Sequence, residues 1–293
     1  MSFTVRPILD AEYAQAREVW DACFPEDAYG YSAYYFARRT APANVLAAFD
    51  GDGAMVGALH AVPYPLRFGD GVKPCAMVAG VATLPAFRHR GVAAALIHAA
   101  HARLKENGVC AAVLKPDVDF YAQFGYLPFA WHGCFTVSAG GLDIPVPALH
   151  GPDAREMLVC YGDFARQYNG MMARTEGDMA LMLEEAFVLG AAAYAAQGAY
   201  AIGAPNGDGC FEVSELVGRD SLPLIAALAE KFGKVRFRLP WGAAPDRLPA
   251  GERMMFSMLC PLDEAALLEG TGARTIAELL SGEIKPNCTL EFC

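Results

Sequence analysis

The stretch from Met77 to Ala93, which reads MVAGVATLPAFRHRGVA, constrains the fold more than any other part of the chain. An apolar run over Met77–Leu84 is closed by Pro85, a basic turn with one glycine follows, and Ala94–Leu104 contains no helix breaker. This order predicts a strand, a tight turn and a helix. The first backbone N–H groups of a helix lack partners within the helix and carry partial positive charge. The sequence therefore predicts an anion-binding site at the turn.

The residues of this turn indicate which kind of anion it binds. Gly91 lets a phosphate approach the backbone closely, and the small side chain of Ala93 leaves the next turn clear. Arg88 and Arg90 add formal positive charge. The predicted ligand therefore carries a pyrophosphate.

Length and composition are typical of a compact protein of the cytosol. With 293 residues, 54% of them hydrophobic and 19% charged, the chain is long enough for two domains and too apolar for disorder. We expect no secretory signal and no membrane span, because the apolar runs are shorter than the roughly 20 residues that a span needs. The nine cysteines are scattered without a zinc-like spacing. Reduced thiols, a cytoplasmic location and no metal site are the prediction.

The formal net charge of −10 argues against nucleic acid as a partner, because phosphate backbones are bound through basic stripes that the sequence lacks. An acidic surface suits a cationic substrate. Solubility alone also accounts for such a charge, so the charge does not choose between these two explanations.

Strand and helix signals alternate along the first part of the chain, which predicts an α/β (α+β mixed sheet) domain. Asp10 is expected to cap the first helix, and the turn at 50–53 to close a hairpin. Gly108 is expected to end the helix after the phosphate turn, so that the strands before and after this helix are parallel. The predicted strands are 3–8, 44–49, 54–62, 66–68, 73–84, 109–114 and a pair of extended segments within 126–137, and the predicted helices are 10–23, 31–39, 91–107 and 117–124.

A second lobe is expected after a Gly- and Pro-containing linker at 139–152. Thr175 and Asp178 are expected to form a capping pair. The order of a hairpin, a helix and a strand echoes the first lobe, but Asp220 stands where a phosphate would lie, so we interpret this lobe as a degenerate, non-binding copy. The predicted helices are 153–168, 175–189 and 220–232, and the strands are 199–203, 210–217 and 234–239.

The predicted domains are thus 1–138, a linker at 139–152, a second lobe at 153–250 and a short C-terminal segment at 251–293. The last segment holds one strand signal at 254–260 and short helix signals at 263–269 and 275–280.

Two motifs together carry a family resemblance. The arrangement Arg88-x-x-Gly91-x-Ala93 follows a predicted strand and opens a helix, and Phe120–Tyr126, which reads FYAQFGY, follows the next strand. This combination resembles the Gcn5-related N-acetyltransferases (GNAT). Within that superfamily the chain is similar to the enhanced-intracellular-survival (Eis) family, whose members have a catalytic GNAT lobe, a degenerate GNAT lobe and a C-terminal sterol-carrier-like domain.

The end of the chain departs from the Eis pattern. Too few residues follow Leu259 for a complete third domain, so 251–293 is expected to be at most a remnant of one. The resemblance therefore does not imply lipid binding or the oligomeric assembly of the family for this chain. A homo-oligomer is still one of the alternatives.

The resemblance implies acetyl-CoA as co-substrate and attack of an amine on its thioester. Tyr121, which matches the family motif, is implied as the acid that protonates the departing thiolate of CoA. An alternative for Tyr121 is simple core packing, which is the preferred interpretation of Phe124 and Tyr126. The residues implied in binding acetyl-CoA are Val81, Ala82 and Thr83 of the strand, through their backbone, and Arg88, His89, Arg90, Gly91, Val92 and Ala93 of the turn.

No general base is visible in the sequence. Many GNAT enzymes place a glutamate on the strand before the turn, but 77–83 has no carboxylate. In the Eis family the carboxylate that ends the chain is thought to reach the active site, and Cys293 would supply it here. Asp117 follows Pro116 and is interpreted more simply as the N-cap of a helix.

The histidines are interpreted as structural or solvated. His98 and His101 lie on one face of their predicted helix together with Lys105, which is typical of a solvent-exposed stripe. His60 lies in a predicted strand, where a satisfied structural histidine is preferred over a place in the acceptor pocket.

These observations predict an acetyl-CoA-dependent N-acetyltransferase acting on an amine of a small cationic molecule or on a lysine side chain. The alternative is a non-catalytic acyl-CoA-binding regulatory module, and a lipid carrier is disfavoured by the length of the last segment. Neither the helices within 10–39 nor the second lobe carries a motif for the acceptor. Nucleic acid and membrane are not expected as partners.

Overall fold

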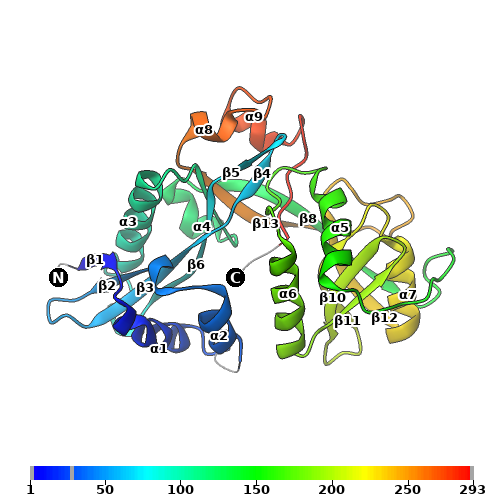
Figure 1. Cartoon of the computed structure of the whole chain (residues 1–293), viewed down its shortest axis with the longest axis horizontal. Helices are drawn as coiled ribbons and strands as arrows, with labels where there is room; N and C mark the ends of the chain where they lie inside the picture. Colours follow the sequence, from blue (N-terminus) through cyan, green and yellow to red (C-terminus); the bar gives the residue numbers. More distant parts are fainter. Residues whose placement is uncertain (1–2, 27–29, 291–293) are drawn as a thin grey trace.

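A mixed sheet of 11 strands runs through the whole molecule, as the α/β prediction required (Figure 1). The computed structural model describes residues 3–26 and 30–290. The strand order is β1-β2-β3-β6-β7-β13-β8-β12-β11-β10-β9, and β4 and β5 form a separate two-stranded sheet. The strands are β1 (Thr4–Pro7), β2 (Val45–Phe49), β3 (Met55–Pro63), β4 (Leu66–Phe68), β5 (Gly71–Lys73), β6 (Cys75–Thr83), β7 (Ala111–Leu114), β8 (Leu127–Ser138), β9 (Ala192–Ala196), β10 (Ala199–Pro205), β11 (Phe211–Val217), β12 (Lys234–Pro240) and β13 (Glu252–Pro261).

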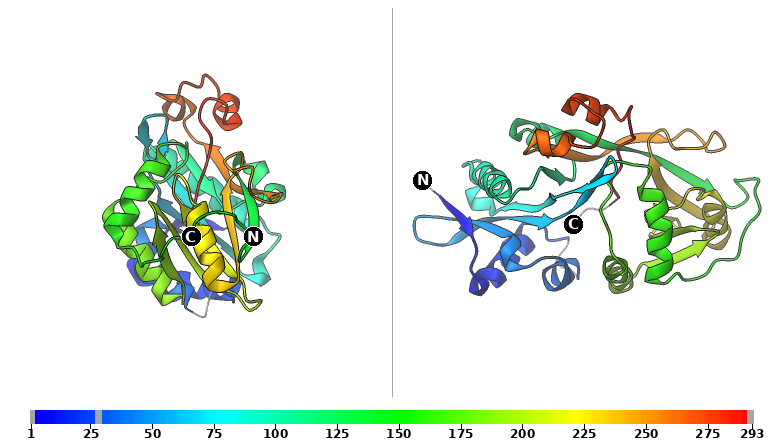
Figure 2. Two further views of the ribbon diagram at one scale, coloured as in Figure 1. Left: turned by 90° about the vertical axis from the view of Figure 1, so that its right-hand side faces the viewer. Right: turned by 45° about the horizontal axis from the view of Figure 1, so that its top comes forward.

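Helices cover both faces of this sheet. In the first lobe α3 packs on one face and α1 on the other (Figure 2). No described helix is both long and apolar enough to cross a membrane. The α-helices are α1 (Tyr13–Cys23), α2 (Tyr31–Tyr34), α3 (Val92–Glu106), α4 (Val118–Tyr121), α5 (Ala154–Ala165), α6 (Glu176–Val188), α7 (Leu222–Phe232), α8 (Glu264–Leu268) and α9 (Ile276–Ser281). A π-helix (Tyr35–Arg39) continues α2, and short 3-10 helices span Asp10–Glu12, Pro42–Asn44, Pro85–Phe87 and Ala122–Phe124.

Both lobes contain a parallel βαβ unit. In the first lobe β6 and β7 are parallel and α3 connects them, which confirms the prediction from Gly108 and the segment after it. In the second lobe β11 and β12 are parallel and α7 connects them, so the echo of the first lobe is real at the level of topology.

The two lobes meet through β13 and β8, which lie side by side in the middle of the sheet (Figure 1). β13 pairs antiparallel with β7 on one side and with β8 on the other, and β8 in turn pairs with β12. The strand of the predicted C-terminal segment therefore completes the sheet of the first lobe. The division of the chain near 138, 152 and 250 stays a prediction.

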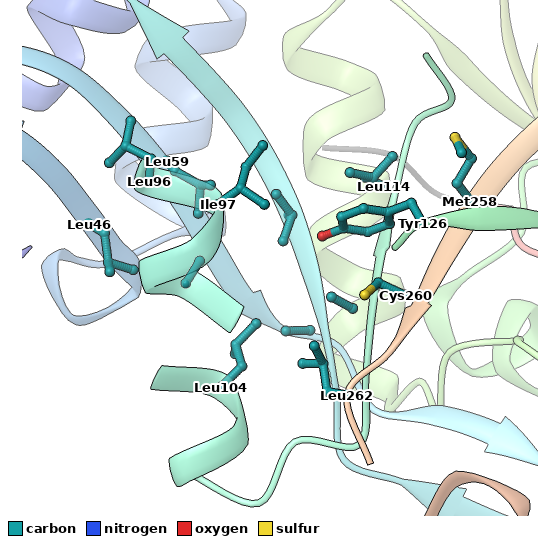
Figure 3. Close-up of a cluster of buried hydrophobic side chains, with 14 of the residues drawn as sticks. Leu46, Leu59, Leu96, Ile97, Leu104, Leu114, Tyr126, Met258, Cys260 and Leu262 are labelled. Carbon is teal, nitrogen blue, oxygen red and sulfur yellow. The ribbon is translucent and has the colours of Figure 1, made fainter. Parts of the chain in front are cut away.

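The core of the first lobe lies between α3 and the sheet (Figure 3). Gly57 on β3 lets this helix approach closely, because a Cβ there would lie 2.8 Å from both Val92 Cγ1 and the carbonyl oxygen of Ala82. Buried side chains from α3, β2, β3, β6, β7 and β13 fill the space, among them Leu46, Leu59, Leu96, Ile97, Leu104, Leu114, Met258 and Cys260.

Local capping differs from the prediction at the first helix. Asp10 makes no capping hydrogen bond; instead the Glu12 carboxylate accepts the N–H of Leu9 at 2.7 Å and pairs with Arg6 at 2.6 Å. Glu12, three residues after Leu9, thus accepts a hydrogen bond from the backbone that precedes the helix, and the helix begins with a 3-10 turn. The predicted pair of Thr175 and Asp178 is confirmed as a capping box.

Two strand predictions need correction. The expected pair of segments within 126–137 is one strand, β8, because β13 and β12 pair along its two edges. β9 was not expected at all. It forms a hairpin with β10 through Gln197 and Gly198, both of which have positive φ angles of 50° and 75°.

Candidate active site

A bulge in β6 marks the centre of the site. The register between β3 and β6 shifts where Ala58 and His60 face Ala82 and Ala79, and Gly80 within this shift has a φ of +54°. A Cβ on Gly80 would lie 2.1 Å from Cζ3 of Trp20. Only glycine therefore fits, because it tolerates the positive φ and leaves room for the indole ring.

Beside this bulge, β6 and β7 separate. Their parallel pairing covers Cys75–Met77 and ends where Met77 faces Val113, although β6 continues to Thr83. Among the described strands, none pairs with the last part of β6 on this side. Its backbone groups are thus available to an extended ligand.

The turn after β6 ends in the open N-terminus of α3. Gly91 takes the left-handed conformation at φ 83° and no side chain caps the helix. The first hydrogen bond of the helix runs from the Ala95 N–H to the Gly91 carbonyl at 3.0 Å, so the N–H groups before Ala95 are not used within the helix. His89 also has a positive φ, of 61°, which folds the turn back toward β6.

A pocket of about 380 Å³, here called the turn pocket, joins the bulge to this helix N-terminus. All residues predicted to bind the cofactor line it except Arg90, whose guanidinium lies 5.4 Å from the centre of the Phe87 ring. The Arg88 Nε donates to the Thr83 carbonyl at 3.3 Å. The lining residues are Cys23, Phe24, Val81, Ala82, Thr83, Phe87, Arg88, His89, Gly91, Val92, Ala93, Ala94, Phe120, Gln123 and Phe124.

Sequence reasoning missed Phe87 and the lining residues outside the stretch 77–93. Cys23 and Phe24 reach the turn pocket from the end of α1, and Phe120, Gln123 and Phe124 reach it from α4 and the 3-10 turn after it. Burial raises the pKa of the Cys23 thiol, which the nearby Arg88 partly opposes. No local sequence signal places these residues beside the turn.

Tyr121 lies at the C-terminal end of α4 and does not line the turn pocket. Asp117 caps this helix, accepting the Phe120 N–H at 3.2 Å, as predicted. The phenol ring is half-buried against Phe120 and Tyr126, with ring centres 4.9 Å and 5.7 Å away. Burial raises the pKa of Tyr121 to about 12, and the Asp117 carboxylate adds to the rise.

A larger pocket of about 630 Å³ lies between the lobes and is called the interlobe pocket. Its lining residues come mostly from α6, from β10, β11, β12 and β13, and from the segment just after β7 and the α2 region. The lining residues are Tyr31, Arg39, Lys115, Pro116, Met182, Glu185, Ala186, Leu189, Ala191, Ile202, Ser214, Glu215, Arg238, Met254, Met255, Phe256 and Leu290.

The carboxylates that line the interlobe pocket are both held by arginines. Arg39 Nε donates to Glu185 at 2.8 Å. Glu215 accepts two bonds from the buried Arg174, at 2.8 Å and 2.6 Å, and one from the Tyr200 hydroxyl at 2.6 Å. Cys293, the other base candidate, lies outside the described residues. Among the described residues, no three His, Cys, Asp or Glu side chains gather in a way that suits a metal ion.

The solvated-stripe interpretation is wrong for His101. Its Nε2 lies 3.1 Å from the hydroxyl of the buried Tyr126, and burial lowers the pKa of His101 to about 4. His60 is fully buried among Trp20, Tyr35 and Phe36, with ring centres 5.1–5.4 Å away, and does not line either pocket. The structural interpretation of His60 therefore holds, but the expectation that its polar atoms are satisfied does not, because neither ring nitrogen has a hydrogen-bond partner among the described residues.

Comparison with known proteins gives a family match for the first lobe. Residues 4–129 match the family model described as Acetyltransferase (GNAT) domain. No curated protein sequence matches the chain significantly.

Several solved structures share the fold. A GCN5-related N-acetyltransferase from Kribbella flavida is 21% identical with a TM-score of 0.66, covering 88% of this chain and 70% of that one. Eis1 from Mycobacterium abscessus is 17% identical with a TM-score of 0.70, covering 89% and 75%. A conserved protein of unknown function and probable N-acyltransferase from Enterococcus faecalis V583 is 17% identical with a TM-score of 0.75, covering 92% and 75%.

The matched domain contains the bulged strand, the open helix N-terminus and the turn pocket between them. The fold beyond this domain also follows that of Eis1. Residues 4–129 are therefore a GNAT acetyltransferase domain, and the overall fold of the chain resembles that of Eis1.

Proposed function

We propose that the chain transfers the acetyl group of acetyl-CoA to a primary amine, with the donor in the turn pocket and the acceptor in the interlobe pocket. The observation that carries this proposal is the separation of β6 from β7 beside the bulge at Gly80. The pantetheine arm can pair with the unpaired edge of β6 as an added strand would. Its pyrophosphate then lies on the N-terminus of α3.

The reaction needs one bond formed and one broken. The amine nitrogen attacks the thioester carbonyl carbon, the carbonyl oxygen gains negative charge, and the C–S bond then breaks to release the CoA thiolate. In this proposal a backbone N–H near Val81, at the bulge that the register shift marks, donates to the developing oxyanion. Tyr121 gives its proton to the leaving thiolate, and the phenol is available for this because its pKa of about 12 keeps it protonated.

The position of Tyr121 along the chain supports its role. Lys115 and Pro116 line the interlobe pocket, whereas Phe120 and Gln123 line the turn pocket. Tyr121 lies on the same short segment, at the end of α4. The segment thus separates the two pockets, which is where the thioester meets the amine.

A free carboxylate base is not part of the proposal. Glu185 and Glu215 both line the interlobe pocket, but each is already paired with an arginine. Among the described residues of the pocket no carboxylate is left unpaired, so in this proposal the proton of the attacking amine leaves through solvent.

The proposal is tested by measuring free CoA thiol released from acetyl-CoA across a panel of primary amines. Amine-dependent release is the expected result. Binding of acetyl-CoA without any amine-dependent release would instead make the chain a non-catalytic acyl-CoA-binding module. Failure to bind acetyl-CoA at all would contradict both interpretations of the turn pocket.

A further inference from the structure

The charges of the described residues around the interlobe pocket do not balance. Its acids are Glu185 and Glu215, and its cations are Arg39, Lys115 and Arg238. Glu185 is paired with Arg39, and Glu215 is paired with the buried Arg174 just behind it. Lys115 and Arg238 are left as positive charge that neither of these two carboxylates neutralises.

Arg238 is the more informative of these two cations because it is half-buried. Its Nη2 donates to the Ser214 carbonyl at 2.9 Å, and its guanidinium carbon lies 5.0 Å from the centre of the Phe256 ring. Within the described part of the chain it forms no ion pair within 4.0 Å, and its remaining N–H groups make no hydrogen bond. Glu212, the acid that raises the pKa of Arg238, is itself 3.6 Å from Arg236.

Burial of such a group has an energetic cost. It lowers the pKa of Arg238, which shows that its charge is partly removed from water. A half-buried guanidinium with unused donors is suited to a carboxylate or phosphate, which accepts two parallel N–H bonds from it.

The rest of the pocket lining is mostly apolar. Met254 and Phe256 come from β13, which lies between β7, just before Lys115, and β12, which carries Arg238. Met182 and Leu189 come from α6 and its C-terminal end. Lys115 directly follows Leu114, the last residue of β7, and so stands at the strand separation where the thioester is expected.

We propose that the acceptor is an amine that also carries an anionic group, with a carboxylate or phosphate bound by Arg238 and an apolar body lying between that group and the reacting nitrogen. This inference rests on the function proposed above and concerns its acceptor class. It reverses the expectation of a cationic acceptor.

The same charge explains how the amine can react when no described carboxylate of the pocket is left unpaired to act as a base. Positive charge from Lys115 near the reacting end disfavours an ammonium ion and favours the neutral amine, which is the nucleophile. A second ammonium at the other end, as in a diamine, would meet Arg238 and be repelled.

The test compares amines that differ only at the far end: aminohexanoate, hexylamine and hexanediamine. Thiol release from acetyl-CoA is expected to give a kcat/KM for aminohexanoate at least about 10-fold above that for hexanediamine. Arg238→Met is expected to lower the ratio of aminohexanoate to hexylamine by about 10-fold or more, and Arg238→Lys to restore part of it. Preference for the diamine, or an unchanged ratio in Arg238→Met, would overturn the inference.

A matched control is Arg253→Met. Arg253 lies on β13 next to the pocket residue Met254, but its guanidinium stacks over Trp131 at 4.2 Å and it does not line the pocket. This variant is expected to keep the native ratio of the three amines.

Binding separates this inference from the proposed function. Calorimetry with N-acetyl-aminohexanoate, the expected product, measures anion recognition without turnover. Binding that is lost in Arg238→Met would support the anion site even if no amine were acetylated. If N-acetyl-aminohexanoate did not bind to the native protein and the three amines reacted equally well, the anionic-acceptor inference would be overturned. The proposed acetyl transfer to amines would still stand.

Discussion

At the scale of single residues, the chemistry depends on how burial sets proton affinity. Tyr121 and His60 show the two directions of this effect. Burial raises the pKa of Tyr121 to about 12 and lowers the pKa of His60 to about 3, because in each case the neutral form is favoured away from water. The first keeps an acid protonated at neutral pH, and the second keeps an imidazole uncharged.

Replacing Tyr121 by phenylalanine removes the proposed acid and keeps the ring that packs against Tyr126. We expect kcat to fall by about 100-fold or more, with little change in the affinity for acetyl-CoA. Steady-state thiol release and calorimetry with acetyl-CoA measure the two quantities. Unchanged kcat would remove Tyr121 from the mechanism and leave it a packing role.

The buried His60 predicts acid sensitivity of the fold. Because its folded pKa of about 3 lies below the ordinary 6.5, the unfolded state binds more protons between these values, and stability is fully present above pH 6.5 and falls as the pH drops toward 3. Each such histidine adds a slope of up to about 1.4 kcal/mol per pH unit in this window. Urea unfolding of the native chain and of His60→Leu at several pH values measures this slope, which should be shallower in the variant. Equal slopes would contradict the prediction.

At the scale of elements, the bulge in β6 sets the shape of the donor site. Its position depends on a contact between Gly80 and Trp20, which lies on α1 across the sheet face from α3. The helix on one face thus fixes the strand edge that the ligand is proposed to use.

Gly80→Ala is expected to lower both stability and acetyl-CoA affinity, because the new methyl group would lie 2.1 Å from the Trp20 ring at a φ of +54°. We expect a loss of about 2–4 kcal/mol in the free energy of unfolding. Gly53→Ala is the matched control, since Gly53 also has a positive φ, of 81°, but its new methyl group would meet no atom within 4 Å. It should lose only about 1 kcal/mol and keep its affinity for acetyl-CoA. Equal effects in thermal unfolding and calorimetry would show that the Trp20 contact is unimportant.

Sequence patterns predicted the elements whose geometry is set locally. The stretch 77–93 contains its own strand, turn and helix start, so the residues of this stretch that line the turn pocket, apart from Phe87, could be named in advance. β9 could not be predicted, because Ala192–Ala196 has no strand signal and glutamine is not a residue type that favours the positive φ found at Gln197. Spacing placed His101 on a helix face but did not reveal that Tyr126 packs against it. Arg238 belongs to a pocket built from distant segments, which a local pattern does not report.

At the scale of the whole molecule, β13 and β8 make the two lobes one sheet. β13 pairs with β7 over Met258–Pro261 and with β8 over Glu252–Leu259, and β8 continues into the second lobe through β12. A substitution that weakens the packing of β13 should therefore destabilise both lobes.

Leu259→Ala tests this coupling, because Leu259 is fully buried in β13. We expect a loss of about 2–5 kcal/mol in a single unfolding transition. Hydrogen exchange followed by mass spectrometry should show faster global opening in both α3 and α7. Faster exchange in α3 with native protection in α7 would show instead that the lobes unfold separately.

The place of β13 also fixes when the first lobe can be finished during synthesis. Residues 4–129 leave the ribosome early, but the strand that fills the edge between β7 and β8 comes from Glu252–Pro261. At ordinary translation rates the nascent chain then waits roughly 10 s with these edges unpaired. Unpaired strand edges can form backbone hydrogen bonds with strands of other chains. Until Glu252–Pro261 has been made and docked, we therefore expect a newly made chain to depend on chaperones to avoid such pairing. The acetyltransferase domain, although it precedes the second lobe in the sequence, becomes complete only after Glu252–Pro261 has been made.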